Sequence, residues 1–98
     1  MIKYIRKRDG RMDQFDVNKI AGAIYKAFQA TEAKYDLDTA IAVAQEVEEK
    51  LEARHSELPT VELVQDTVEE TLISKGYVRI AKAYILYRAE RTRSRDRK

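Results

Sequence analysis

The chain has 98 residues, a length suited to one domain with a single modest core. Charged residues make up 37% and hydrophobic residues 44%, with 3 glycines and 1 proline, which favours a helix-dominated globular protein over a disordered or sheet-rich one. The net charge of +2 does not mark a nucleic-acid binder, and the lack of cysteine excludes disulfides, thiolate nucleophiles and Cys-ligated zinc. The lone His55 has no second histidine with which to form a metal site.

Residues 2–15 are predicted to form a β-hairpin that turns at Asp9-Gly10, because this dipeptide readily adopts the positive φ angles of a type I′ turn. With these two residues at the centre of the turn, Arg6 faces Asp13 and Tyr4 faces Phe15 across the strands. An isolated two-stranded hairpin is marginal in water. We therefore expect it to lie against the helices that follow.

Four helices are predicted, at about residues 17–30, 37–54, 61–75 and 77–91, from apolar residues at helical spacing. Asp16 and Thr60 are placed to cap the first and third, and Gly76 to end the third. The fourth is apolar or aromatic around much of its circumference, which is typical of the most buried helix of a bundle. The expected fold is mainly α: a four-helix bundle capped by an N-terminal β-hairpin lid.

The two ends of the chain bear on domain limits and location. No apolar residue follows Ala89, so residues 92–98 are interpreted as a basic tail or a linker to a following domain, and the domain as residues 1–91. The N-terminus lacks the apolar run of a secretory signal, and nowhere do about eighteen apolar residues stand together. These features predict a cytoplasmic protein with no membrane segment.

The chemistry-bearing residues are few. The sequence has no P-loop, no dinucleotide-binding glycine motif, no zinc-protease motif and no nucleophile elbow, so enzyme activity is the weaker hypothesis. What remains is a basic cluster near the free N–H groups at the start of the first helix, an arrangement suited to phosphates: Arg6, Lys7, Arg8 and Lys19. Asp13 and Asp16 are placed either to hold a hydrated Mg²⁺ or to orient the cations. The alternative is that the basic hairpin is only solvated surface.

Four segments resemble, in the right order, the signature segments of the ATP-cone family: IRKRDG at 5–10, FDVNKI at 15–20, TVELVQD at 60–66 and AKAYILYR at 81–88. The resemblance spans nearly the whole chain. It implies a non-catalytic regulatory domain that binds ATP or dATP, with ATP activating and dATP inhibiting a ribonucleotide reductase. The expected partners are adenine nucleotides, the catalytic domain of the parent enzyme, and a second cone through self-association. We expect the parent to be a ribonucleoside-triphosphate reductase of the anaerobic class.

The resemblance also implies the site. Lys7, Arg8 and Lys19 would hold the phosphates, residues 13–18 would surround adenine and ribose, and Val64 would form an apolar wall under the base. Thr60 would contact the nucleotide, although it is equally placed as a plain helix cap. Tyr84 and Tyr87 are candidates for closing the site, but tyrosines at helical spacing are more often core. The full set is Ile5, Lys7, Arg8, Asp13, Gln14, Phe15, Asp16, Val17, Asn18, Lys19, Thr60, Val64, Tyr84, Tyr87, Arg88 and Arg91.

Two rival functions remain open. A nucleic-acid-binding or transcriptional-regulator module would use the basic hairpin and the arginine-rich tail. That module needs stacking residues on an exposed face, and the aromatic residues are predicted to be mostly buried, so nucleic acid is disfavoured as a partner. A helical adaptor without any ligand would leave the basic hairpin with no nucleotide role.

Overall fold

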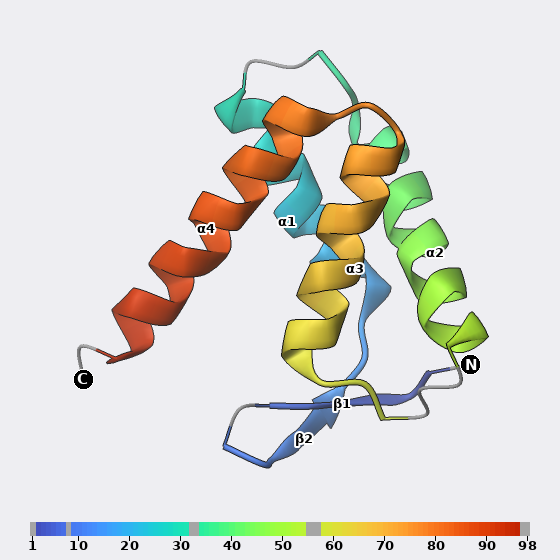
Figure 1. The fold of residues 1–98 in the computed structure, drawn as a ribbon, viewed down its shortest axis with the longest axis vertical. Helices are drawn as coiled ribbons and strands as arrows, with labels where there is room; N and C mark the ends of the chain where they lie inside the picture. The colour runs from blue at the N-terminus through green and yellow to red at the C-terminus, as the bar shows by residue number, and fades with distance from the viewer. Residues whose placement is uncertain (1, 8, 32–33, 55–57, 97–98) are drawn as a thin grey trace.

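A computed structural model describes residues 2–7, 9–31, 34–54 and 58–96, with side chains as far as Arg88. The predictions for Arg8 and His55, and for the side chain of Arg91, lie outside the described residues. Two short strands precede four helices, which confirms the predicted fold. The elements are β1 (Tyr4–Arg6), β2 (Met12–Gln14), α1 (Val17–Ala30), α2 (Leu37–Ala53), α3 (Val61–Ser74) and α4 (Val78–Asp96) (Figure 1).

The helix boundaries follow from local capping. The carboxylate of Asp16 accepts a hydrogen bond from the Asn18 N–H at 2.9 Å, and the Thr60 hydroxyl accepts one from the Leu63 N–H at 3.1 Å. Gly76, with a φ of 86°, lies just beyond α3, where a residue other than glycine would be strained. Helix α4 continues past the predicted end at residue 91 to Asp96, because the segment contains no glycine or proline to stop it.

The hairpin register differs by one residue from the predicted one. The observed pairs are Tyr4 with Gln14, Ile5 with Asp13 and Arg6 with Met12. The Gly10 N–H donates to the Lys7 carbonyl at 2.9 Å, and the Lys7 N–H donates to the Arg11 carbonyl at 2.8 Å, so the loop has three residues and not two. A three-residue loop that ends on a glycine with positive φ, here 88°, is a common hairpin alternative to type I′.

This register decides which side chains share a face of the hairpin. Side chains alternate between the two faces along a strand, and a slip of one residue moves each to the other face. Ile5, Lys7 and Asp13 are therefore on the same face, and all three are partly buried. Tyr4 and Met12, on the opposite face, are 46% and 59% exposed. The acidic partner of Lys7 is thus brought to its side of the hairpin.

The hairpin is fastened to the bundle by backbone and side-chain contacts. The Arg6 N–H donates to the carbonyl of Pro59 at 2.9 Å, and Arg6 forms a parallel bridge with Thr60, the residue that caps α3. Ile2 is only 5% exposed and belongs to the core, against which Phe15 also packs. Figure 1 shows the hairpin lying across the end of the bundle where α1 and α3 begin.

The core is mainly aliphatic and includes one fully buried phenylalanine. Phe28, on α1, is fully buried, and its ring lies 5.2 Å from the Tyr35 ring and 6.4 Å, edge-on, from the Tyr77 ring. The aromatic contacts close the end of the bundle opposite the hairpin. The other large, fully buried aliphatic residues come from α1, α2 and α3: Ile24, Val43, Val47, Leu51, Val68 and Leu72.

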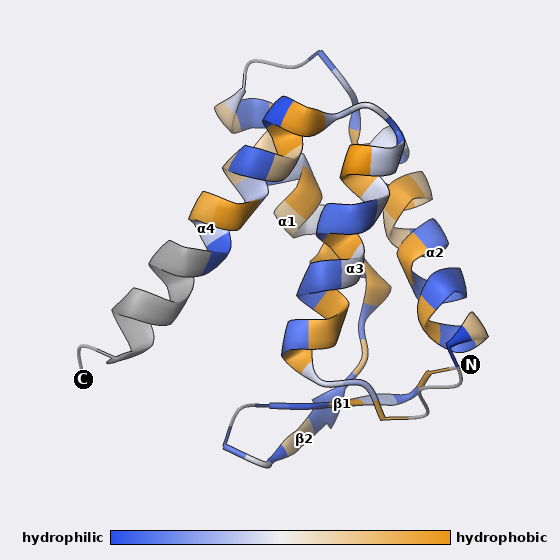
Figure 2. Ribbon diagram, in the orientation of Figure 1, coloured by the Kyte–Doolittle hydropathy of each residue, from blue (hydrophilic) through white to orange (hydrophobic). Residues whose placement is uncertain are grey.

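Helix α4 is not the most buried helix, contrary to the prediction. Ile80, Ala81 and Tyr84 are buried, but Ile85 and Leu86 are 41% and 67% exposed. Figure 1 shows α4 leaning away from the other helices toward its C-terminus, and Figure 2 shows apolar residues midway along it. Apolar though it is, neither α4 nor another helix of the described residues is long and hydrophobic enough to cross a membrane.

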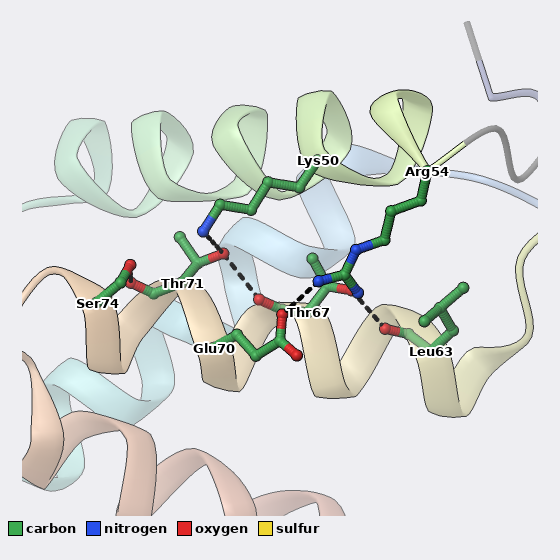
Figure 3. Close-up of polar contacts among 7 residues, drawn as sticks. All are labelled: Lys50, Arg54, Leu63, Thr67, Glu70, Thr71 and Ser74. Carbon is green, nitrogen blue, oxygen red and sulfur yellow. Dashed lines mark hydrogen bonds and ion pairs between the residues drawn. The ribbon is translucent and has the colours of Figure 1, made fainter.

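The contact between α2 and α3 is partly polar. Thr67 and Thr71 are fully buried, and their hydroxyls donate, each at 2.7 Å, to carbonyls one turn earlier on α3 (Figure 3). The Lys50 ammonium donates to the Thr71 hydroxyl at 3.1 Å, and Arg54 pairs with Glu70 at 2.7 Å. Every buried hydroxyl in this seam therefore has a partner, which removes the cost of an unsatisfied polar group.

The full burial of Phe28 makes its truncation costly. Phe28→Ala is expected to lower the free energy of unfolding by about 3–5 kcal/mol, because it leaves a cavity and removes both ring contacts. Urea denaturation followed by circular dichroism measures the change. The matched control Ile73→Ala, at a position 53% exposed, is expected to stay within about 0.5 kcal/mol of the parent. A Phe28 variant as stable as this control would contradict the described core.

Candidate functional site

The hairpin end of the bundle combines two helix N-termini with a basic hairpin. Helix α1 begins directly after β2, and α3 begins at Thr60, which pairs with β1. The first turn of a helix has N–H groups without intrahelical partners and carries a partial positive charge. The Asp16 and Thr60 side chains each accept from one such N–H. The remaining donors and the nearby lysines favour an anion here.

Asp13 forms an ion pair with one of the predicted phosphate-binding cations, Lys7. Its carboxylate lies 3.4 Å from the Lys7 ammonium and accepts a hydrogen bond from the Gln14 N–H at 2.8 Å. This N–H is the main cause that holds the pKa of Asp13 below its ordinary value, followed by Lys7, with a smaller contribution from Lys19. The contact with Lys7 is compatible with the predicted role of Asp13 in orienting the cations, which stays a prediction.

The other predicted role, metal binding, lacks a set of protein ligands. No group of three or more acidic or histidine side chains is placed to hold a metal within residues 2–7, 9–31, 34–54 and 58–88. Asp16, the second candidate, uses one carboxylate oxygen to cap α1. A Mg²⁺ ion here would need most of its ligands from phosphates and water, as this ion usually does in nucleotide sites.

A hollow of about 490 Å³ lies where the hairpin joins α1 and faces α2. Four consecutive residues of the predicted site line it, from Gln14 to Val17. Its charged groups are Lys3, Asp16 and Glu48, so its net charge is negative and it suits an uncharged ring or sugar better than phosphates. The remaining lining residues are Ile2 and Tyr4. Lys7, Lys19, Thr60 and the predicted residues of α4 do not line this hollow.

The predicted residues of α3 and α4 have mainly structural contacts. Val64 is 7% exposed and Tyr84 is 6% exposed, so both belong to the core, as expected for a tyrosine at helical spacing. Tyr87 is half-buried, and the Lys26 ammonium lies 3.4 Å from its hydroxyl oxygen and 5.4 Å from its ring centre. Tyr87 therefore ties α4 to α1 by a hydrogen bond and a cation–π contact.

Arg88 ties α4 to α3. Its guanidinium donates to the carboxylate of Asp66 at 3.2 Å and, at shorter range, to that of Glu69. The prediction singled out Arg88 but missed both carboxylates, although Asp66 and Glu69 stand three residues apart on the predicted third helix and so share a face. The contact of Arg6 with Pro59 was also missed, because a backbone hydrogen bond between distant segments has no side-chain pattern.

Tyr84 provides a test of this packing by pH. Burial raises its pKa from 10.0 to about 12, against a smaller opposite effect of Arg88. A raised pKa favours the neutral phenol, so this stabilisation is complete below pH 10.0 and is lost as the pH rises from there through about 12. We expect the alkaline absorbance titration of the chain, minus that of Tyr84→Phe, to give one tyrosine with a pKa near 12. A difference titration centred on the ordinary pKa, in folded protein, would contradict the burial of Tyr84.

Comparison with known proteins gives a family match and several relatives. The model of the ATP cone domain matches residues 3–93. The vitamin B12-dependent ribonucleoside-diphosphate reductase of Thermoplasma acidophilum is 39% identical over 100% of the chain, and the ribonucleoside-diphosphate reductase subunit alpha of Chlamydia pneumoniae is 38% identical over 96%. The anaerobic ribonucleoside-triphosphate reductase of Haemophilus influenzae is 33% identical over 94%. The chain spans only 10–13% of the length of these relatives.

Proposed function

The chain belongs to the ATP-cone family, a family of nucleotide-binding regulatory domains, and on that premise we propose that it binds ATP or dATP at the hairpin end of the bundle and controls a ribonucleotide reductase. The observation that carries this proposal is the ion pair of Lys7 with Asp13 beside the start of α1, where Lys19 stands in the first turn. Cations beside a helix N-terminus form an arrangement suited to a phosphate chain.

Phosphate binding would proceed by exchange of partners. In the free chain Asp13 neutralises Lys7 across 3.4 Å. A triphosphate has several negative oxygens and would compete for the same ammonium groups, with Arg8 as a third cation. The displaced Asp13 carboxylate would then be the protein group available to a Mg²⁺ ion that accompanies the phosphates, and its lowered pKa favours the ionised form that a metal ligand requires.

The base and sugar would lie along the corner between β2 and α1. Gln14 to Val17 line the hollow there, with Asp16 as their one charged residue, and Asn18 follows at the start of α1. Ile5 would provide an apolar contact from the inner face of the hairpin, and Thr60, the cap of α3, would contact the ligand. Val64 is buried in the free chain, so its predicted role as a wall under the base requires that ligand binding expose it. ATP and dATP differ only at the 2′ position, so the discrimination between them must come from the 2′-hydroxyl or from the seating of the sugar.

Arg88 would couple the site to α4. In the free chain it donates to Asp66 and Glu69 of α3. If the phosphates draw Arg88 or Arg91 toward the hairpin, α4 loses an attachment to α3 and changes its direction. A regulatory effect requires such a difference in free energy between two states, typically about 1–3 kcal/mol.

The parent enzyme would be a reductase in the cytoplasm. The matched relatives include a vitamin B12-dependent enzyme, a subunit alpha and an anaerobic triphosphate reductase, so the comparison supports a reductase without selecting the anaerobic class that the sequence predicted. The partners would be its catalytic domain and a second cone, with ATP favouring the active assembly and dATP the inhibited one.

The first test is nucleotide selectivity. Titration calorimetry of the chain is expected to give dissociation constants in the micromolar range for ATP and dATP, about 8 kcal/mol of binding free energy at 1 μM. GTP and CTP are expected to bind more weakly, because their bases cannot make the contacts of adenine. Equal affinity for all four nucleotides, or no binding of any, would exclude the adenine site.

The second test removes the proposed phosphate ligands one at a time. Lys7→Ala and Lys19→Ala are each expected to cost roughly 1.5–3 kcal/mol of ATP affinity, the range of a charge-assisted hydrogen bond. Folding stability should change little, because both ammonium groups are at the surface. Lys75→Ala is the matched control: it removes the same charge from the other end of the bundle, where Lys75 pairs with Glu46 at 3.3 Å. If all three variants bind alike, the phosphates lie elsewhere.

A further inference from the structure

Helix α4 has two apolar sides, and the described part of the chain covers only one. Ile80, Ala81 and Tyr84 form the buried side. Val78, Ile85 and Leu86 are 48%, 41% and 67% exposed. A helix that is apolar around its circumference is ordinarily enclosed on all sides. The exposed side of α4 therefore has the composition of an interface.

The exposed residues form one continuous stripe. Val78, Ile85 and Leu86 occupy positions i, i+7 and i+8, which fall on one side of a helix with 3.6 residues per turn. The exposed cations Arg79, at i+1, and Lys82, at i+4, lie on the same side of the helix. The buried residues of α4 lie on the opposite side, toward α1 and α3. The stripe runs along the N-terminal half of α4, from its first residue to Leu86.

We propose that this stripe, defined as Val78, Lys82, Ile85 and Leu86, is the surface through which the domain docks on the remainder of its own polypeptide, an apolar surface with an acidic group opposite Lys82. The inference rests on the proposed role as a regulatory part of a longer reductase. It does not depend on where the nucleotide binds, because none of the four residues belongs to the predicted nucleotide site.

The size of the stripe argues for a covalently attached partner. Its three apolar side chains expose at most a few hundred Å² in total, the size of an ordinary surface patch. A stable complex between separate molecules buries roughly 800 Å² on each partner. A second copy of the chain would therefore not be held by this stripe alone. A segment of the same polypeptide needs less area, because attachment gives it an effective concentration in the millimolar range.

The length of the relatives provides the attached partner. The chain corresponds to 10–13% of the reductases that it matches, and the match with the family model ends at residue 93, on α4 itself. A docked α4 also supplies a route for the signal. Release of Arg88 from Asp66 and Glu69 at the nucleotide site would alter the direction of the same helix that presents the stripe.

Cysteine labelling tests the proposal directly, since the chain has no cysteine of its own. Leu86→Cys is introduced into the isolated chain and into the full-length polypeptide, and its reaction with a maleimide is followed by peptide mass spectrometry. In the full-length protein the rate is expected to fall roughly tenfold or more, because a docked side chain is accessible only when the interface opens. The matched control Ile73→Cys, on α3 and 53% exposed, should react at similar rates in both.

Three results would overturn the proposal. Equal labelling rates of Leu86→Cys in the two proteins would show that the stripe is uncovered in the full-length polypeptide. A reading frame that ends with this chain would remove the proposed partner. Protection in the isolated chain that grows with concentration would assign the stripe to a second copy.

A second variant separates this proposal from nucleotide binding. Leu86→Glu should leave the calorimetric ATP affinity of the isolated chain within about twofold of the parent, because Leu86 is outside the predicted site. In the full-length reductase it should weaken the response of activity to dATP. An unchanged response would contradict the docking role. If the unsubstituted chain binds no nucleotide while Leu86→Cys is still protected in the full-length polypeptide, the proposed ligand is wrong and the proposed docking surface is retained.

Discussion

The hydrogen bond from the Arg6 amide to the Pro59 carbonyl is the constraint on which the geometry of the candidate site depends. A two-stranded hairpin with three residues in each strand has too little buried surface to hold a fixed position in water. The bond, together with the bridge between Arg6 and Thr60, adds the segment before α3 to the edge of β1. Burial of Ile2 in the core then fixes the N-terminal end of the hairpin.

This attachment links the cations to the helix ends. The same bridge that positions β1 involves the residue that caps α3, so a movement of the hairpin is transmitted to the start of that helix. On the hairpin, Lys7 and Asp13 share the inner face and form an ion pair that is partly exposed to solvent. Partly exposed pairs contribute little to stability, so this one is easily exchanged for a ligand. A site of this kind can bind an anion without unfolding the domain.

The four helices differ in how much of their described surface is packed into the core, and α4 is packed least. Helices α1, α2 and α3 enclose the large aliphatic residues around Phe28, and the polar seam between α2 and α3 has its buried hydroxyls satisfied. Helix α4 contributes fewer buried residues and is attached by Tyr84 and by the polar contacts of Tyr87 and Arg88. Polar contacts near the surface can be rearranged at lower cost than a packed core. A conformational change within this domain would therefore involve a movement of α4.

The sequence alone determined the elements and the family. Helical spacing of apolar residues, caps at Asp16 and Thr60, and glycine after α3 are local features, so they predicted the four helices to within one residue except at the end of α4. Only the tertiary structure decided the rest. The hairpin register depends on a loop of three residues in place of two, and a local dipeptide is compatible with both. The partners of Arg6 and Arg88, and the exposure of Leu86, depend on how distant segments meet. A helix that is apolar on two sides carries no information in its own sequence about which side its own chain covers.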